Sequence, residues 1–166
     1  MTARFPSVRM RRLRDNAGIR RMVQETRLSV SDFIYPLFVT HGRDVRSEIP
    51  PMPGIYQLSL DQLIQEVGEA SDLGINSVLL FGIPASKDPE GTEAYASGGI
   101  IQDAVRAITQ ALPGMLVITD VCLCEFTDHG HCGIIQAGRA DTHSPLDLLS
   151  PLALGQVSAG PVLVAP

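Results

Sequence analysis

Residues Met115–Gly133, "MLVITDVCLCEFTDHGHCG", join a continuously apolar run to a polar loop that holds all three cysteines of the chain. The run Met115–Val121 is rich in β-branched residues and lacks polar alternation, which is the pattern of a parallel strand buried on both faces. In parallel β/α folds, active sites form at the carboxyl ends of the strands. The loop that follows this strand is therefore the candidate functional site.

Three other segments share this apolar pattern and predict further parallel strands: Phe33–Val39, Ser77–Ile83 and Pro161–Pro166. The four runs begin about forty residues apart. This is the spacing of repeated β/α units.

Helical periodicity fills the gaps between these strands and predicts helices over residues 60–73, over residues 100–111 and from Ser144 onward. The first helix should begin with a capping box formed by Ser59 and Gln62 and end at Gly74. The last helix is the weakest of the three, because Pro151 lies inside it. The resulting order of elements is βαβαβαβ.

Two architectures fit this order, an open doubly wound sheet and part of an eight-stranded β/α barrel. The first strand is followed by "VTHGRDVR", which lacks the Gly-rich turn of nucleotide-binding sheets. This absence argues against a nucleotide-binding sheet. A complete barrel needs eight strands and roughly 250 residues, whereas this sequence supplies four strands and stops on the last of them.

The composition indicates one domain with a hydrophobic core, since 45% of the 166 residues are hydrophobic and 19% are charged. No apolar run reaches the roughly 20 residues that span a bilayer, and the start of the sequence lacks the apolar segment of a secretory signal. Three cysteines cannot all pair within one chain. We therefore expect a cytoplasmic protein with reduced thiols and no membrane partner.

The N-terminal segment is strongly basic. Residues 1–27 carry eight arginines against Asp15 and Glu25, while the rest of the chain carries five basic and sixteen acidic residues. Such a segment could bind nucleic acid or an anionic membrane. It has few aromatic residues for stacking, however, so we expect an arm that packs on an acidic body, its own or that of a neighbouring subunit, and no nucleic-acid partner.

The spacing C-x-C-x7-C of the three cysteines predicts a metal site. Thiolates are soft ligands that favour zinc, and three protein ligands leave the open position that is typical of catalytic zinc. His129 or His131 could instead supply a fourth ligand and close the site. The alternative is that Cys122, Cys124 and Cys132 pack as small hydrophobic residues, which a polar loop makes less favourable.

Several segments in sequence order resemble the porphobilinogen synthase family, also called δ-aminolevulinic acid dehydratase. They are "RMRRLR", "DFIYPLFV", "IPPMPGIYQLSLDQL", "GINSVLLFGIP", "KDPEGTEAY", "ITDVCLC" and the loop "DVCLCEFTDHGHCG". The resemblance runs from about Arg9 to Gly133 and is looser from Ile134 onward, although "SAGPVLVAP" still resembles the family's next strand.

The resemblance implies a fold and an activity. The fold is a (β/α)8 barrel of the TIM-barrel family, of which residues 33–166 would form about the first four β/α units and residues 1–32 an extended basic arm. That arm would embrace a neighbour in a homo-octamer. The implied reaction condenses two 5-aminolevulinate molecules to porphobilinogen, a step of tetrapyrrole and heme biosynthesis in the cytoplasm.

The resemblance also assigns site residues. Cys122, Cys124 and Cys132 match the family's zinc ligands, and Asp120 matches a polar active-site residue that would orient a substrate ammonium or assist proton transfer. An alternative role for Asp120 is to fix the loop through backbone N–H groups. The family's Schiff-base lysines and its magnesium site match no position here, and the single lysine, Lys87, is expected to be a solvated loop residue.

We therefore expect this chain to be the first half of the enzyme, a fragment that is inactive alone and associates through unpaired strand edges. A non-catalytic zinc-binding subunit or assembly module is the alternative, because it would need no lysine. An aldolase that forms a Schiff base through Lys87 is disfavoured, since this lysine lies in a loop.

Overall fold

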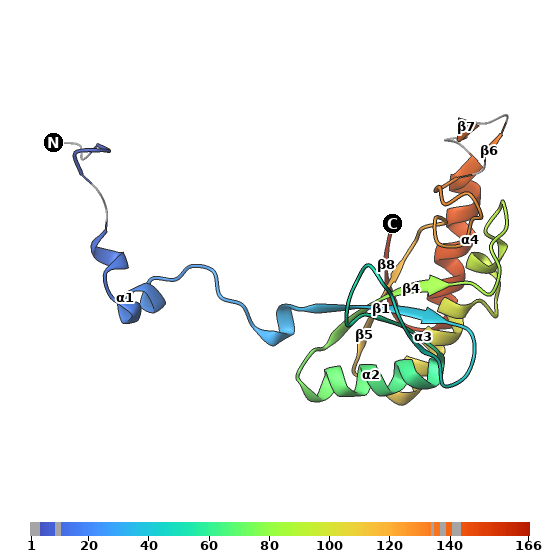
Figure 1. Ribbon diagram of the computed structural model, residues 1–166, viewed down its shortest axis with the longest axis horizontal. Coiled ribbons are helices and arrows are strands. Elements are labelled where there is room, and N and C mark those ends of the chain that lie inside the picture. The colour runs from blue at the N-terminus through green and yellow to red at the C-terminus, as the bar shows by residue number, and fades with distance from the viewer. Residues whose placement is uncertain (1–3, 9–10, 134, 137–138, 141–143) are drawn as a thin grey trace.

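The computed structural model describes residues 4–8, 11–133, 135–136, 139–140 and 144–166. A six-stranded sheet forms its centre, in the order β2-β3-β1-β4-β5-β8 (Figure 1). All neighbouring strands are parallel except β2 and β3, which are antiparallel. The strands are β1 (Ile34–Thr40), β2 (Arg46–Glu48), β3 (Tyr56–Leu58), β4 (Ser77–Ile83), β5 (Leu116–Asp120) and β8 (Val162–Ala165).

The four strands predicted from apolar runs are confirmed as β1, β4, β5 and β8, with ends that differ from the prediction by one residue at most. Strands β1 and β4 pair along their whole length, from Ile34 opposite Ser77 to Thr40 opposite Ile83. The pairing of β4 with β5 stops earlier, at Leu80 opposite Thr119. Strand β4 therefore extends beyond the point where β5 turns into the cysteine-bearing loop.

The three predicted helices are also present, as α2 (Leu60–Asp72), α3 (Ile100–Ala111) and α4 (Ser144–Ala159). Helix α3 packs against both α2 and α4, and α4 also contacts β8 (Figure 1). Gly74 follows α2 in the left-handed conformation, with φ of 89°, and ends that helix as predicted. Helix α4 continues through Pro151, next to the fully buried Leu152 that ties it to the core.

All three helices share one apolar core with the same face of the sheet. The buried strand side chains of this core are Leu37, Val39, Leu58, Val78, Leu80 and Val117. Because side chains alternate between the faces of a strand, Phe38 and Phe81 point to the other face, where their rings stack with centroids 5.2 Å apart. Helices cover both faces of a doubly wound sheet but only the outside of a barrel. Helix cover on one face is therefore the arrangement of a β/α barrel and not of a doubly wound sheet.

The predicted capping box of α2 is wrong. The Ser59 hydroxyl accepts a hydrogen bond from the Val45 N–H at 2.9 Å and donates one to Asp61 at 2.7 Å, while the Gln62 side chain donates to Asp44 at 2.8 Å. Ser59 is completely buried. Its side chain is therefore used to hold the loop after β1 rather than to cap the helix.

The sequence patterns did not predict the shortest elements. These are β2 and β3, the two-stranded sheet of β6 (Ile135–Gln136) and β7 (Arg139–Ala140), helix α1 (Ala17–Met22) and the 3-10 helices η1 (Arg12–Arg14), η2 (Val30–Asp32) and η3 (Thr92–Tyr95). None of these segments shows the continuous apolar run or the helical period on which the other predictions rested. Strand β3 pairs with the carboxyl half of β1, through Phe38 opposite Gln57 and Val39 opposite Leu58.

The N-terminal segment extends away from the sheet (Figure 1). Of its described residues up to Phe33, all are exposed except Ile19, which is half-buried. Large apolar side chains are among them, with Phe5 79%, Met22 73% and Leu28 78% exposed. The described part of this segment therefore adds nothing to the core.

None of the helices in the described ranges combines the length and the apolar character needed to cross a lipid bilayer.

Candidate metal centre

The three cysteines meet at the carboxyl end of β5, in a segment that we call the thiol loop (residues 121–133). Their sulfur atoms all lie within 4.8 Å of one another. Cys124 Sγ and Cys132 Sγ lie 3.0 Å apart. The structure thus brings together the three residues that the sequence spacing singled out.

Buried apolar residues and a tight turn fold the thiol loop back on itself. Leu123 and Phe126 are only 1% and 3% exposed, and the N–H groups of Phe126 and Thr127 both donate to the Leu123 carbonyl at 2.9 Å. The chain then reverses near Gly130, which has φ of 71°, a conformation that glycine adopts without strain. The Thr127 hydroxyl donates to the His131 carbonyl at 3.1 Å and closes the turn.

The thiols share hydrogen bonds that favour a single negative charge among them. Burial raises the pKa of the Cys122 and Cys124 thiols, and their contacts with Cys132 raise both further. Burial also raises the pKa of Cys132, but hydrogen bonds from the other two cysteines outweigh it and leave this pKa below its ordinary value. Cys132 is therefore the thiol of the three that ionises most readily. A bound cation would allow all three to ionise.

The donor set fits zinc. With Zn–S bonds of about 2.3 Å, two sulfurs of a tetrahedral site lie about 3.8 Å apart. All three sulfurs lie within 4.8 Å of one another, and Cys124 Sγ and Cys132 Sγ are 3.0 Å apart, so the separations are of the size that a tetrahedral zinc site needs. Cys132 is exposed, so its side chain has room for the small shift that binding would need.

Neither histidine of the thiol loop belongs to the cluster. Among the described His, Cys, Asp and Glu side chains, only the three cysteines form a group with all ligand atoms within 4.8 Å of one another. His129 instead contacts the Pro89 carbonyl at 3.3 Å through Nε2, and its ring stacks on His131 at a centroid distance of 5.9 Å. The three-sulfur set therefore keeps a fourth position free of described protein ligands.

Two carboxyl groups lie beside the thiols. Burial raises the pKa of Asp120, the last residue of β5. Its carboxylate makes no hydrogen bond to the described backbone of the thiol loop, while its main-chain carbonyl accepts one from Gln156 at 3.0 Å. Burial, together with the negative charge of Asp120, raises the pKa of Glu125 to about 7.

Glu125 was not singled out from the sequence. Its Oε2 accepts a hydrogen bond from the Gly82 N–H of β4 at 3.2 Å. The sequence feature that could have pointed to Glu125 is its position between Cys124 and Phe126, because an acidic residue next to a buried apolar residue is itself drawn toward the protein interior. Glu125, and not Asp120, is the residue whose carboxylate anchors this loop to a backbone N–H.

The loop after β4 is joined to the thiol loop by backbone hydrogen bonds. The Asp88 N–H donates to the Phe126 carbonyl at 3.3 Å, and the Asp128 N–H donates to the Asp88 carbonyl at 3.2 Å. The Asp88 carboxylate accepts hydrogen bonds from the N–H and the hydroxyl of Thr92, which hold the pKa of Asp88 below its ordinary value. Lys87, in the same loop, is exposed as expected.

His41, which follows β1, contacts a carboxylate rather than the thiols. Its Nε2 lies 2.6 Å from Glu93 Oε1, and Glu93 also accepts hydrogen bonds from the Ala85 N–H at 3.1 Å and the Ile100 N–H at 3.4 Å. His41 and Glu93 therefore connect the loops after β1 and β4 to the start of α3.

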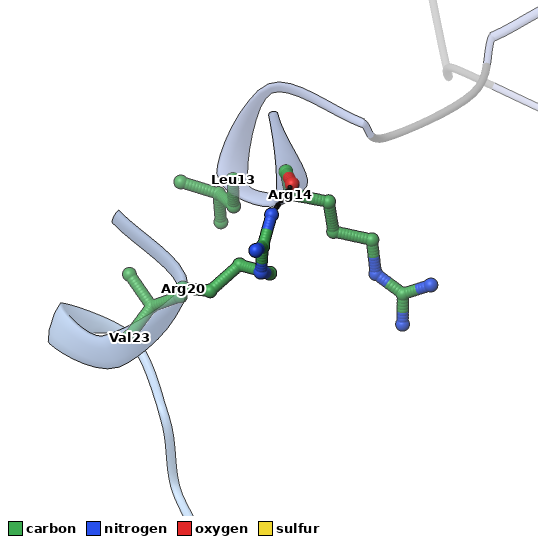
Figure 2. Close-up of a pocket in the computed structure, with 4 residues that line it drawn as sticks. All are labelled: Leu13, Arg14, Arg20 and Val23. Atoms are coloured by element: carbon green, nitrogen blue, oxygen red, sulfur yellow. Dashed lines mark hydrogen bonds between the residues drawn. The ribbon is translucent and has the colours of Figure 1, made fainter. Parts of the chain in front are cut away.

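A separate open pocket lies in the N-terminal segment, between η1 and α1. Figure 2 shows the residues that line it, Leu13, Arg14, Arg20 and Val23. The Arg20 side chain spans it and donates to the Arg14 carbonyl at 2.6 Å. This pocket is far from the sheet (Figure 1) and contains none of the candidate site residues.

A parallel β/α sheet covered by helices on one face, with three clustered thiols at the end of β5, defines a barrel-class protein with a candidate metal centre. The chain belongs to the delta-aminolevulinic acid dehydratase family, whose model matches residues 7–166. The resemblance seen in the sequence is thereby confirmed, and the match includes the looser part after Gly133.

Curated relatives support the same conclusion. The chain is 52% identical to a delta-aminolevulinic acid dehydratase of Halalkalibacterium halodurans, over 95% of this chain and 48% of the relative. It is 48% identical to that of Bacillus subtilis, over 95% of this chain and 49% of the relative. The chain spans about half the length of the curated relatives it matches.

A solved structure has the same fold. It is the delta-aminolevulinic acid dehydratase of Toxoplasma gondii in complex with the reaction product porphobilinogen, with 33% identity and a TM-score of 0.89. The match covers 95% of this chain and 46% of that chain.

Proposed function

We propose that this chain supplies the zinc-binding half of a porphobilinogen synthase, the enzyme that condenses two 5-aminolevulinate molecules to porphobilinogen with loss of two waters. The observation that carries the proposal is the cluster of Cys122, Cys124 and Cys132 sulfurs within 4.8 Å of one another at the carboxyl end of β5. Family membership over residues 7–166 and the porphobilinogen bound in the Toxoplasma relative support it.

The three cysteines would hold the zinc ion, and the exposed position of Cys132 leaves the cluster reachable by small molecules. When bound, zinc supplies a Lewis acid that polarises a substrate oxygen or lowers the pKa of a bound water. The fourth position of the tetrahedron is left for that ligand.

Asp120 would act on the substrate from the same edge of the sheet. It is the last residue of β5, two positions before Cys122, and burial raises its pKa. A carboxyl group in this state can hold a proton at a higher pH than an exposed aspartate and can accept one from a substrate ammonium. Asp120 is therefore the proposed proton-handling residue of this half.

The chemistry of the family also needs lysines that form Schiff bases with the substrates. The only lysine in this sequence, Lys87, is exposed in the loop after β4. We therefore assign the Schiff-base lysines, and any magnesium site, to parts of the longer relatives that have no counterpart here. In this proposal the chain is inactive by itself.

The partner of the basic N-terminal segment would be another copy of the protein in a cytoplasmic homo-octamer. Eight arginines lie in residues 1–27, whereas the remainder has an excess of eleven acidic residues. Apolar side chains such as Phe5, Met22 and Leu28 are at least 73% exposed. An acidic neighbour would neutralise the arginines and cover these side chains.

A chimera tests the function directly. Residues 7–166 would replace the matching part of the full-length Halalkalibacterium relative, and porphobilinogen formation from 5-aminolevulinate would be measured. The account predicts an active, zinc-containing chimera that loses both activity and zinc when Cys122, Cys124 or Cys132 is changed to serine. A folded chimera that stays active with all three cysteines replaced would refute the proposed role of the cluster.

A further inference from the structure

At the edge of the sheet next to the thiols, the Gly82 N–H of β4 donates to a side chain rather than to the neighbouring strand β5. The β4–β5 ladder ends at Leu80 opposite Thr119, two residues before Gly82. Strand β5 ends one residue later, at Asp120, and the chain then enters the thiol loop. The Gly82 N–H donates to Glu125 Oε2 at 3.2 Å, so this side chain takes the place of the missing strand partner.

Both ends of this hydrogen bond are fixed by packing. A Cβ atom on Gly82 would lie 2.8 Å from the side chains of Ile101 and Phe126, which shows how closely the β4 backbone approaches the thiol loop. Glu125 lies between Cys124 and the buried Phe126. A displacement of the Glu125 side chain from Gly82 would therefore be transmitted to the adjacent Cys124.

We propose that Glu125 is a positioning residue of the metal centre, whose carboxylate uses the Gly82 N–H to hold Cys124 at its place beside Cys132. This inference rests on the proposed zinc function of the three cysteines. Glu125 itself is not proposed as a ligand, because the cluster of ligand atoms within 4.8 Å contains only cysteines among the described residues.

The other attachment of the thiol loop does not depend on this side chain. The Asp88 N–H and carbonyl bond to the backbone of Phe126 and Asp128, and these bonds remain when Glu125 is replaced. We therefore expect removal of the carboxylate to loosen the cysteine end of the loop rather than to unfold it.

The first test is zinc affinity, measured by chelator competition on the full chain. Glu125→Ala should weaken zinc binding by about 10- to 100-fold, the usual cost of removing a group that orients a ligand. Glu125→Gln keeps an oxygen acceptor for the Gly82 N–H and should stay close to the wild-type affinity. Asp128→Asn removes one negative charge from an exposed side chain of the same loop and serves as the matched control.

The second test needs no metal. Amide hydrogen exchange of the metal-free chain should become faster at Gly82 in Glu125→Ala, with Leu80 unchanged, and should keep its wild-type rate in Glu125→Gln and Asp128→Asn. If Glu125→Ala fails to fold, the Glu125→Gln variant provides the test. A Glu125→Gln protein with the zinc affinity and the Gly82 exchange rate of the wild type supports the positioning role. A Glu125→Gln protein that loses both overturns it.

The two proposals fail in different ways. Wild-type protein that binds no zinc refutes the zinc function, and the exchange rate at Gly82 still decides whether Glu125 holds the loop. Wild-type protein that binds zinc, with Glu125→Ala equal to it in affinity and in Gly82 exchange, overturns the positioning role alone. An affinity loss as large in Asp128→Asn as in Glu125→Ala would also overturn it, since charge and not position would then be the cause.

Discussion

Glu66 is expected to be the main polar residue that attaches the β2–β3 hairpin to the body of the protein. Its Oε1 accepts a hydrogen bond from the Tyr35 hydroxyl of β1 at 2.7 Å, and its Oε2 accepts one from Arg46 Nη1 of β2 at 2.8 Å. The Arg46 guanidinium also lies 4.3 Å from the ring centroid of Tyr56 in β3. Replacing Glu66 by alanine therefore removes two hydrogen bonds, one from β1 and one from β2.

The magnitude follows from the exposure of each partner. The Glu66 side chain is 17% exposed and that of Arg46 is 44% exposed. The hydrogen bond from Tyr35 to a charged acceptor contributes about 1.5–3 kcal/mol, whereas the exposed contact with Arg46 adds only about 0.5 kcal/mol. We therefore expect Glu66→Ala to lower the free energy of unfolding by about 2–3 kcal/mol, or the melting temperature by roughly 4–12 °C.

Urea and thermal unfolding of the chain measure this effect. Glu69→Ala is the matched control, because Glu69 lies on the same helix, is exposed, and accepts its side-chain hydrogen bond from Gln65 at 3.1 Å rather than from Tyr35 or Arg46. We expect the control to change stability by less than about 0.5 kcal/mol. A double-mutant cycle with Tyr35→Phe should give a coupling energy of about 1 kcal/mol or more. Equal effects of the two glutamate variants, or strict additivity in the cycle, would refute the reasoning.

The same site predicts a pH dependence. Burial tends to raise the pKa of Glu66, but the hydrogen bonds from Tyr35 and Arg46 outweigh it and leave this pKa below its ordinary value. The stabilisation is therefore complete above the ordinary pKa and is lost as the pH falls through the folded value. Burial and Glu66 raise the pKa of Tyr35 to about 12. Its contribution is present below the ordinary value of 10.0 and is lost as the pH rises through about 12.

Three further predictions concern the edge of the sheet that carries the thiols. Gly82→Ala should destabilise the chain by about 1–3 kcal/mol, measured by urea unfolding, because the new Cβ would lie 2.8 Å from Ile101 and Phe126; unchanged stability would contradict the close packing. Asp88→Ala should speed amide hydrogen exchange at Thr92, whose N–H and hydroxyl it binds, and equal exchange in both proteins would argue against this anchor. The 166-residue chain alone should form no porphobilinogen from 5-aminolevulinate, since its only lysine is the exposed Lys87; turnover at a normal enzymatic rate would disprove this.

The sequence was most informative where apolar residues are continuous. Four apolar runs predicted β1, β4, β5 and β8, because parallel strands without polar alternation differ clearly from their surroundings. Strands β2 and β3 have three residues each and follow no such pattern. They form because tertiary contacts hold them, including the one between Arg46 and Glu66.

Helix ends show how tertiary contacts override a local motif. Ser59 and Gln62 have the spacing of a capping box, yet their side chains bond to Val45, Asp61 and Asp44. These partners lie in the loop after β1 and within the first turn of α2. Spacing alone cannot reveal that the serine is completely buried.

The cluster of three cysteines was predictable from the sequence, but the contacts that hold it in place were not. The spacing of Cys122, Cys124 and Cys132 is visible in the sequence, and the structure places their sulfurs within 4.8 Å of one another. The contact between Glu125 and Gly82 joins residues 43 positions apart. It depends on β4 extending past β5, which no local pattern encodes.

The most direct test of the central claim is the metal content of the purified chain, measured by elemental analysis after dialysis against zinc and removal of the excess. We expect about one zinc per chain in the wild type and a marked loss in each of Cys122→Ser, Cys124→Ser and Cys132→Ser, because three sulfurs are needed to hold the ion. A wild-type chain that retains no zinc, or a triple serine variant that retains as much as the wild type, would contradict the claim.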